Sequence, residues 1–157
     1  MPYKHPLAVG VVVWYSRWYA NRVVHEADLV LYIGSHTDSQ VTNEWRVPAM
    51  GTPVIQIDVD QSEVGRTYSA QVALQGDAKA SVRRLIEASE PVGERSAWVS
   101  RAQELVKEWR EEVAPLANSD AVPIIPQRLC TEITNWLPSD AMLVADPGHA
   151  GIWTGSM

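Results

Sequence analysis

Three short apolar runs in the first half of the chain each stop at a glycine or an acidic residue, and this pattern constrains the fold most. Such runs are typical of parallel strands in an α/β sheet, and Leu29–Ile33 is apolar enough for a central strand covered on both faces. Parallel strands leave their carboxyl ends on one edge. The runs are Leu29–Ile33, ending at Gly34; Thr52–Asp58; and Ala70–Leu74, followed by Gly76-Asp77.

Helical spacing of apolar residues predicts the elements that flank this sheet. Asp77 is placed to cap a helix at its first turn. The predicted helices are Trp14–Glu26, Ala78–Ala88, Arg95–Leu116 and Gln127–Leu137. The expected fold is α/β: a partial Rossmann-like (doubly wound) parallel sheet with flanking helices, plus a C-terminal helix-strand extension.

The composition divides the chain at two linkers rich in Pro, Gly, Ser and acidic residues. We expect a partial Rossmann-like domain over residues 1–90 and a linker with an amphipathic helix over 91–125. The third unit, 126–157, contains a β-like run, Ala141–Ala145, that leads into a loop beginning at Asp146. A turn of helix is also expected near Asn43–Arg46.

Charge and composition exclude several classes of protein. A net charge of −6 over 157 residues disfavours nucleic acid and anionic membranes as partners. No apolar run approaches the ~20 residues that span a bilayer. Cys130 is the single cysteine and lies in a helical pattern, so a buried thiol is favoured over a nucleophile. The prediction is a soluble cytoplasmic protein.

The strand ends carry the candidate binding residues, and each has a plain structural alternative. Gly34-Ser35-His36 is either a ligand loop or a simple strand-to-loop turn. Asp58 with Asp60 could hold a ribose hydroxyl or a metal, or Asp60 could cap the turn after it. Gly76-Asp77 is explained well by helix capping. Their coincidence on one sheet edge favours a nucleotide more than any one motif does.

A fourth candidate follows the last predicted strand. His149, in Asp146-Pro147-Gly148-His149, could bind a phosphate or transfer a proton, or could simply be exposed. No phosphate-loop or metal-ligand spacing is present. The cluster of aromatic residues between Trp14 and Tyr19 is expected to pack in the core or an interface.

In order along the chain, these segments resemble the thiamine diphosphate-dependent enzymes of the acetolactate synthase type. Residues 126–153 resemble the entry into that family's cofactor-binding domain, and the earlier segments resemble its central domain. The central-domain segments are His5–Gly10, Ala20-Asn21, Glu26–Gly34, Pro53–Asp60 with Glu63–Gly65, and Gly76–Lys79.

The resemblance implies cofactors and site residues. In the family the central domain is a six-stranded Rossmann-like sheet that in some members binds FAD or another adenine nucleotide. The nucleotide-facing positions would be Gly34, Ser35, His36, Asp58, Gly76 and Asp77. Gly148 and His149 would lie near the phosphates of thiamine diphosphate, which is held with Mg²⁺. The implied chemistry is decarboxylation of a 2-oxo acid, or joining of its acyl fragment to a second carbonyl.

The chain also departs from the family pattern. It lacks the domain that carries the activating glutamate and the Gly-Asp-Gly magnesium motif, so we assign no catalytic residue and no metal ligand. Pro147 removes a backbone N–H that a phosphate could use. We therefore expect a fragment or remnant that is inactive alone and would need a completing chain.

The alternative is a reused half-domain that acts as a non-catalytic binding or self-assembling module. An incomplete sheet leaves an open strand edge, and open edges invite pairing with another chain. This alternative predicts a homo-oligomer with the Trp-rich N-terminal helix in the interface.

Overall fold

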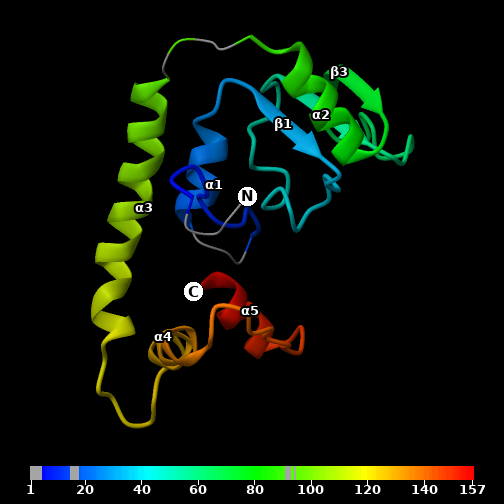
Figure 1. The fold of residues 1–157 in the computed structure, drawn as a ribbon. Helices are drawn as coiled ribbons and strands as arrows, with labels where there is room; N and C mark the ends of the chain where they lie inside the picture. The colour runs from blue at the N-terminus through cyan, green and yellow to red at the C-terminus, as the bar shows by residue number, and fades with distance from the viewer. Residues whose placement is uncertain (1–4, 15–17, 91–92, 94) are drawn as a thin grey trace.

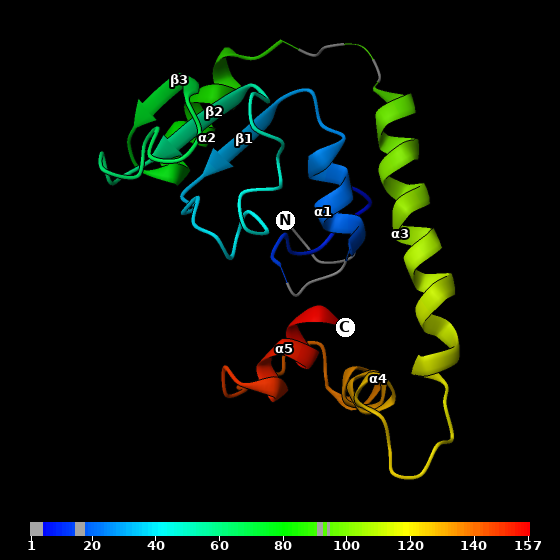
Figure 2. The same ribbon diagram turned by 180° about the vertical axis from the view of Figure 1, so that it is seen from behind.

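A three-stranded parallel sheet and a group of helices make up the chain (Figures 1 and 2). The computed structural model describes residues 5–14, 18–90, 93 and 95–157. Its elements are α1 (Trp18–His25), β1 (Val30–Ile33), β2 (Val54–Asp58), β3 (Ala70–Gln75), α2 (Ala78–Ala88), α3 (Ser96–Ala117), α4 (Pro126–Trp136) and α5 (His149–Ser156). The predicted α/β fold with a parallel sheet is confirmed.

The sheet has the order β1-β2-β3, so β2 is its central strand. Val54 and Ile57 of β2 are 0% and 1% exposed, whereas Leu31 and Ile33 of β1 are 40% and 37% exposed. The prediction that Leu29–Ile33 is a central strand covered on both faces is therefore wrong. The run is apolar enough for that position, but β1 has a single neighbouring strand within the described part of the chain.

An apolar cluster joins α1 to α3. Tyr19 and Ala20 of α1 pack on Leu105 of α3, and all three are at most 2% exposed. The ring of Tyr19 lies 5.0 Å, centroid to centroid, from that of Trp109. The buried residues of α1 thus pack inside the chain, as the expectation of core packing has it, and a place for this helix in an interface between copies stays a prediction.

The α1–α3 junction also carries an ion pair on its exposed side. Arg101 of α3 contacts Glu26, just after α1, with Nε 2.9 Å from Oε2. The hydrogen bonds from Arg101 and Arg22 lower the pKa of Glu26 to about 2. The predicted helix Trp14–Glu26 is observed from Trp18 to His25, and residues 15–17 lie outside the described residues.

The other predicted helices form within one residue of their expected bounds. Asp77 caps α2 as predicted, because its Oδ1 accepts the N–H of Ala80 at 2.9 Å. Cys130 is buried within α4, as expected. Among the described helices, none combines the length and the apolar character needed to cross a membrane.

Three predicted local structures differ in the fold. Ala141–Ala145 forms no strand: Met142 and Val144 are each 92% exposed, and no described strand lies beside them to complete a ladder. The apolar run of residues 7–13, whose sequence predicts a short buried strand or the lead into a helix, forms neither strand nor helix. The turn at Asn43–Trp45 is left-handed, with φ of 48° to 61°, and not a turn of ordinary helix.

Candidate functional site

The carboxyl ends of the three strands meet at one edge of the sheet. The N–H of Gly34 donates to the carbonyl of Ile57 at 2.8 Å, and the N–H of Gly76 donates to the carbonyl of Asp58 at 2.8 Å. The ladder thus continues to the residue at which each predicted motif begins. The structure therefore brings Gly34, Asp58 and Gly76 together, as parallel pairing requires.

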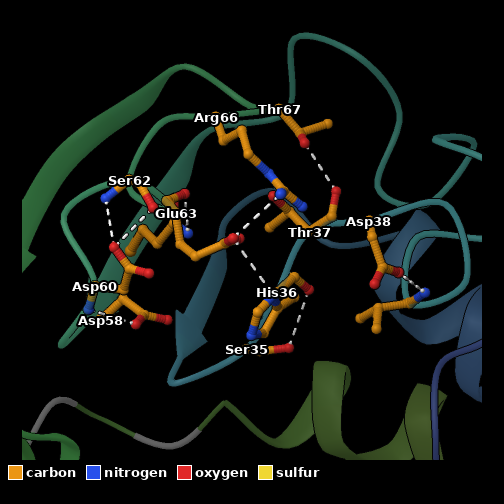
Figure 3. A network of polar contacts seen from close by, with 12 residues as sticks. Ser35, His36, Thr37, Asp38, Asp58, Asp60, Ser62, Glu63, Arg66 and Thr67 are labelled. Atoms are coloured by element: carbon orange, nitrogen blue, oxygen red, sulfur yellow. Dashed lines mark hydrogen bonds and ion pairs between the residues drawn. The ribbon is translucent and has the colours of Figure 1, made fainter.

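Gly34 turns the chain sharply as it leaves β1. Its φ of +55° lies in the left-handed region, which favours glycine. A Cβ at this position would lie 4.0 Å from the Cβ of Ala78 in the first turn of α2, an ordinary contact distance. The backbone conformation, and not crowding, is therefore what requires glycine here. Ser35, His36 and Thr37 then pass over the edge of the sheet (Figure 3).

A buried carboxylate lies beneath this loop. Glu63, in the turn between β2 and β3, has a side chain that is 8% exposed, and one of its oxygens meets two basic groups (Figure 3). His36 Nδ1 lies 3.4 Å and Arg66 Nη1 lies 3.1 Å from Glu63 Oε1. Sequence reasoning missed Glu63 and Arg66 as site residues, although their i,i+3 spacing is a signal of an ion pair.

Among the described residues, two buried polar atoms of the same region have no hydrogen-bond partner. They are Glu63 Oε2 and Thr37 Oγ1; Thr37 is 1% exposed and Glu63 is 6% exposed. An unsatisfied buried polar atom costs about 1–3 kcal/mol, so native folds rarely leave two together. Polar atoms in this position are suited to the hydroxyl or amino groups of a bound molecule, or to water.

Gln56 fixes the turn that carries Glu63. Its side chain is 1% exposed and holds two backbone groups of the turn at once. Gln56 Nε2 donates to the carbonyl of Glu63 at 2.8 Å, and its Oε1 accepts the N–H of Gly65 at 2.9 Å. Gly65 closes the turn with a φ of +72°. A buried amide in the middle of β2 thus sets the position of the carboxylate.

Asp58, the last residue of β2, and Asp60, two residues later, have different roles. Asp58 is buried, and its Oδ1 accepts the N–H of Asp60 at 2.9 Å. Asp60 Oδ1 accepts both the hydroxyl and the N–H of Ser62, at 2.7 and 2.8 Å, and these bonds lower the pKa of Asp60. Asp60 therefore caps the turn, which is the plain alternative for this residue. Asp58 remains as the acid at the strand end.

The N-terminus of α2, which begins at this edge, is already capped by Asp77. The Asp77 carboxylate accepts a backbone N–H of α2, so a negative charge already stands at the positive end of the helix. A phosphate placed there would meet that carboxylate. The edge therefore fits groups that donate to carboxylates, such as the hydroxyls of a ribose, better than it fits a phosphate at α2.

The segment predicted to bind thiamine diphosphate, Gly148-His149, lies away from the sheet edge. Gly148 and His149 are exposed, and His149 is the first residue of α5, which packs near α4 and away from the sheet (Figures 1 and 2). The N–H of Gly148 donates to Asp146 Oδ1 at 3.0 Å, and Pro147 has no N–H. The structure does not join this segment to the sheet edge.

Within the described ranges, no group of three or more His, Cys, Asp or Glu side chains is placed to hold a metal ion.

Comparisons with known proteins identify the relatives of the chain. Residues 1–85 match the family described as thiamine pyrophosphate enzyme, central domain. A probable acetolactate synthase large subunit of Methanocaldococcus jannaschii is 31% identical over 97% of this chain and 26% of its own length. The acetolactate synthase large subunit of Porphyra purpurea is 30% identical, over 93% of this chain and 25% of its own length.

A third relative, the acetolactate synthase isozyme 3 large subunit of Escherichia coli, is 24% identical over 94% of this chain. The chain spans about a quarter of the length of these curated relatives. With the parallel sheet and the matched central domain, they confirm the resemblance seen in the residues. The chain belongs to the thiamine diphosphate-dependent enzymes of the acetolactate synthase type, through their central domain.

Proposed function

We propose that this chain supplies the nucleotide-facing edge of the central domain of an acetolactate synthase-like enzyme. One observation carries the proposal: three strand ends meet at one edge, above a buried carboxylate whose second oxygen has no hydrogen-bond partner among the described residues. The occupant would be FAD or another adenine nucleotide, held as a structural element.

The residues at this edge have distinct roles in the proposal. Asp58 would accept a ribose hydroxyl, and Gly34 lets the backbone approach the ligand. His36, which is largely exposed, would stack on or hydrogen-bond the nucleotide, and Glu63 holds it in place from below. Ser35, Gly76 and Asp77 complete the edge, with Asp77 acting mainly as the helix cap.

Thiamine diphosphate, held with Mg²⁺, supplies the carbanion chemistry of this family when it is bound. In the segment around Gly148 and His149, the Gly148 N–H is not available to the phosphates of this cofactor, because it already donates to Asp146. We propose that the 157-residue chain does not turn over a 2-oxo acid alone and needs a completing chain. A cytoplasmic setting stays a prediction.

Calorimetric titration of the chain with FAD, and separately with thiamine diphosphate plus Mg²⁺, tests these proposals. We expect FAD to bind and thiamine diphosphate not to bind. Asp58→Asn should weaken FAD binding by about tenfold or more, which is the worth of one charge-assisted hydrogen bond. His149→Ala is the matched control and should leave FAD binding unchanged.

Absence of FAD binding, or equal losses in the two variants, would contradict the nucleotide site. Tight binding of thiamine diphosphate by the chain alone would contradict the proposed need for a completing chain.

A second candidate function, a self-assembling module, is favoured by the amount of exposed surface. The chain exposes 11005 Å². A compact monomer of 17.4 kDa is expected to expose about 7,900 Å². The surplus of about 3,100 Å² exceeds what one subunit buries in an ordinary complex, about 800 Å². Apolar side chains contribute to it, including those of β1.

A further inference from the structure

His36 is an exposed residue that lies against a buried one. Its side chain is 67% exposed, whereas the side chain of Glu63 is 8% exposed. The ring meets the carboxylate through Nδ1, which lies 3.4 Å from Glu63 Oε1 (Figure 3). The two nitrogens of an imidazole point in diverging directions, so Nε2 is the nitrogen left for a molecule bound at the sheet edge.

The carboxylate of Glu63 is held in place without help from His36. The buried Gln56 side chain holds the turn, through the Glu63 carbonyl and the Gly65 N–H. The Arg66 guanidinium holds the side chain, with Nη1 3.1 Å from the same Oε1 atom. Because these contacts keep the buried carboxylate from following the ring, Glu63 sets the position of His36 and not the reverse.

The loop that carries His36 is tied to the same turn by a second contact. The Thr67 hydroxyl donates to the carbonyl of Thr37 at 2.8 Å, and Thr37 is 1% exposed. His36 and Thr37 are adjacent in the loop, and each contacts the turn between β2 and β3. The two contacts together fix the distance between the ring and the Glu63 carboxylate.

The chemistry of the two groups favours one position for the ring proton. A carboxylate oxygen only accepts hydrogen bonds, so it attracts an N–H and repels a nitrogen lone pair. At 3.4 Å the contact is longer than the 2.7–3.2 Å typical of a hydrogen bond, but the sign of the electrostatic interaction is the same. Arg66, the other group at Oε1, only donates and so offers the ring no alternative acceptor.

We propose that Glu63 is a positioning residue of the nucleotide-facing edge and acts through His36. It holds the neutral ring with its proton on Nδ1, so that Nε2 accepts a hydrogen bond from a hydroxyl or amino group of the bound molecule. With Asp58, this places two acceptors at the edge. The inference deepens the proposed nucleotide site and rests on it.

The ¹⁵N chemical shifts of the His36 ring test the first step in the 157-residue chain. At about pH 8.5 an ordinary imidazole is neutral, and in water it prefers its proton on Nε2. We expect the proton on Nδ1 in the wild type and on Nε2 in Glu63→Leu, which has no acceptor. Glu63→Gln keeps an acceptor oxygen, which the donors of Arg66 and His36 turn toward themselves, so it should restore the Nδ1 proton.

The matched control removes an acid from another i,i+3 ion pair. Glu87 of α2 contacts Arg84 with 3.8 Å between Oε2 and Nη1, as Glu63 contacts Arg66 three residues later. Glu87→Leu makes the same change in net charge as Glu63→Leu. It should alter neither the tautomer of His36 nor the binding of FAD.

Calorimetric titration with FAD tests the second step as a double-mutant cycle. Glu63→Leu should weaken FAD binding by about fivefold to tenfold, the worth of one hydrogen bond. In a His36→Ala background the same change should have no effect, because the residue through which Glu63 acts is gone. On addition of FAD to the wild type, Nε2 should stay unprotonated and its ¹⁵N signal should move upfield.

The outcomes separate this role from the nucleotide site itself. No FAD binding by the wild type overturns both. FAD binding with equal losses from Glu63→Leu in the two backgrounds overturns the role of Glu63 alone, and so does a protonated Nε2 in the complex. Should Glu63→Leu fail to fold, the free wild type decides: a proton on Nδ1 supports the inference, and a proton on Nε2 overturns it.

Discussion

The carboxyl edge of the sheet and the segment Asp146–His149 have similar residues but different structures. Both combine glycine, histidine and aspartate after an apolar run. At the sheet edge these residues follow paired strands and lie over Glu63, which is 6% exposed. At Asp146–His149 every residue is exposed, the preceding run forms no strand, and the aspartate satisfies the neighbouring glycine N–H.

The difference shows what makes such a motif into a site. A strand paired with a neighbouring strand fixes where the backbone ends, and the buried groups beneath it fix where the side chains point. Without a neighbouring strand the same residue types satisfy one another locally, because a turn is the nearest source of hydrogen-bond partners. Four changes would break or sharpen this comparison.

The largest effect is expected from removing side-chain volume in the two apolar runs. Ile57→Ala, at a position 1% exposed, should lower the free energy of unfolding by about 2–5 kcal/mol because it leaves a cavity beneath the site. Val144→Ala, at a position 92% exposed, should change it by less than about 0.5 kcal/mol. Urea unfolding followed by circular dichroism measures both. Similar losses of unfolding free energy in the two variants would contradict the claim that only the paired run is packed.

A smaller effect is expected from the buried amide that holds the Glu63 turn. Gln56→Leu keeps the volume but leaves the Glu63 carbonyl and the Gly65 N–H without their partner, so we expect a loss of about 1–3 kcal/mol. Gln71→Leu, on the exposed side of β3, is the control and should have little effect. The same unfolding experiment distinguishes them; a neutral Gln56→Leu would show that the turn holds itself.

A change of about 1 kcal/mol or less is expected in α5, where two glycines differ in their surroundings. Gly155 has open space, so Gly155→Ala should stabilise the helix by up to about 1 kcal/mol. A Cβ at Gly151 would lie 2.5 Å from the carbonyl oxygen of Asp146, so Gly151→Ala should lose that gain and displace the Asp146 turn. Amide hydrogen exchange within α5 reports both effects. Equal protection in the two variants would show that the Asp146 turn moves aside at no measurable cost.

The smallest effect concerns one titration at the sheet edge. Hydrogen bonds from Ser62 lower the pKa of Asp60, so Ser62→Ala should raise it toward its ordinary value. Because the folded-state pKa is lowered, the wild-type contribution to stability is present above the ordinary pKa and fades as the pH falls. Carboxyl ¹³C shifts of Asp60 followed against pH measure the change, and an unmoved midpoint would assign the shift to another group.

Local sequence patterns predicted much of the fold. The strands at β2 and β3, the bounds of α2 and α3 and the cap at Asp77 follow from periodicity and capping, which depend on neighbouring residues. The buried state of Cys130 was also predicted correctly. The nucleotide-binding roles of the residues at the strand ends stay predictions.

The tertiary structure decided the features that depend on partners distant in the sequence. Leu29–Ile33 has the composition of a central strand, yet its position depends on how many strands lie beside it. The contact of Glu63 with His36 bridges two loops, and no local pattern encodes that distance. The run Ala141–Ala145 resembles a strand but has no neighbouring strand among the described residues. The sequence determined which segments prefer helix or extended structure, whereas pairing and burial decided which of them form a site, because those energies exist only between segments.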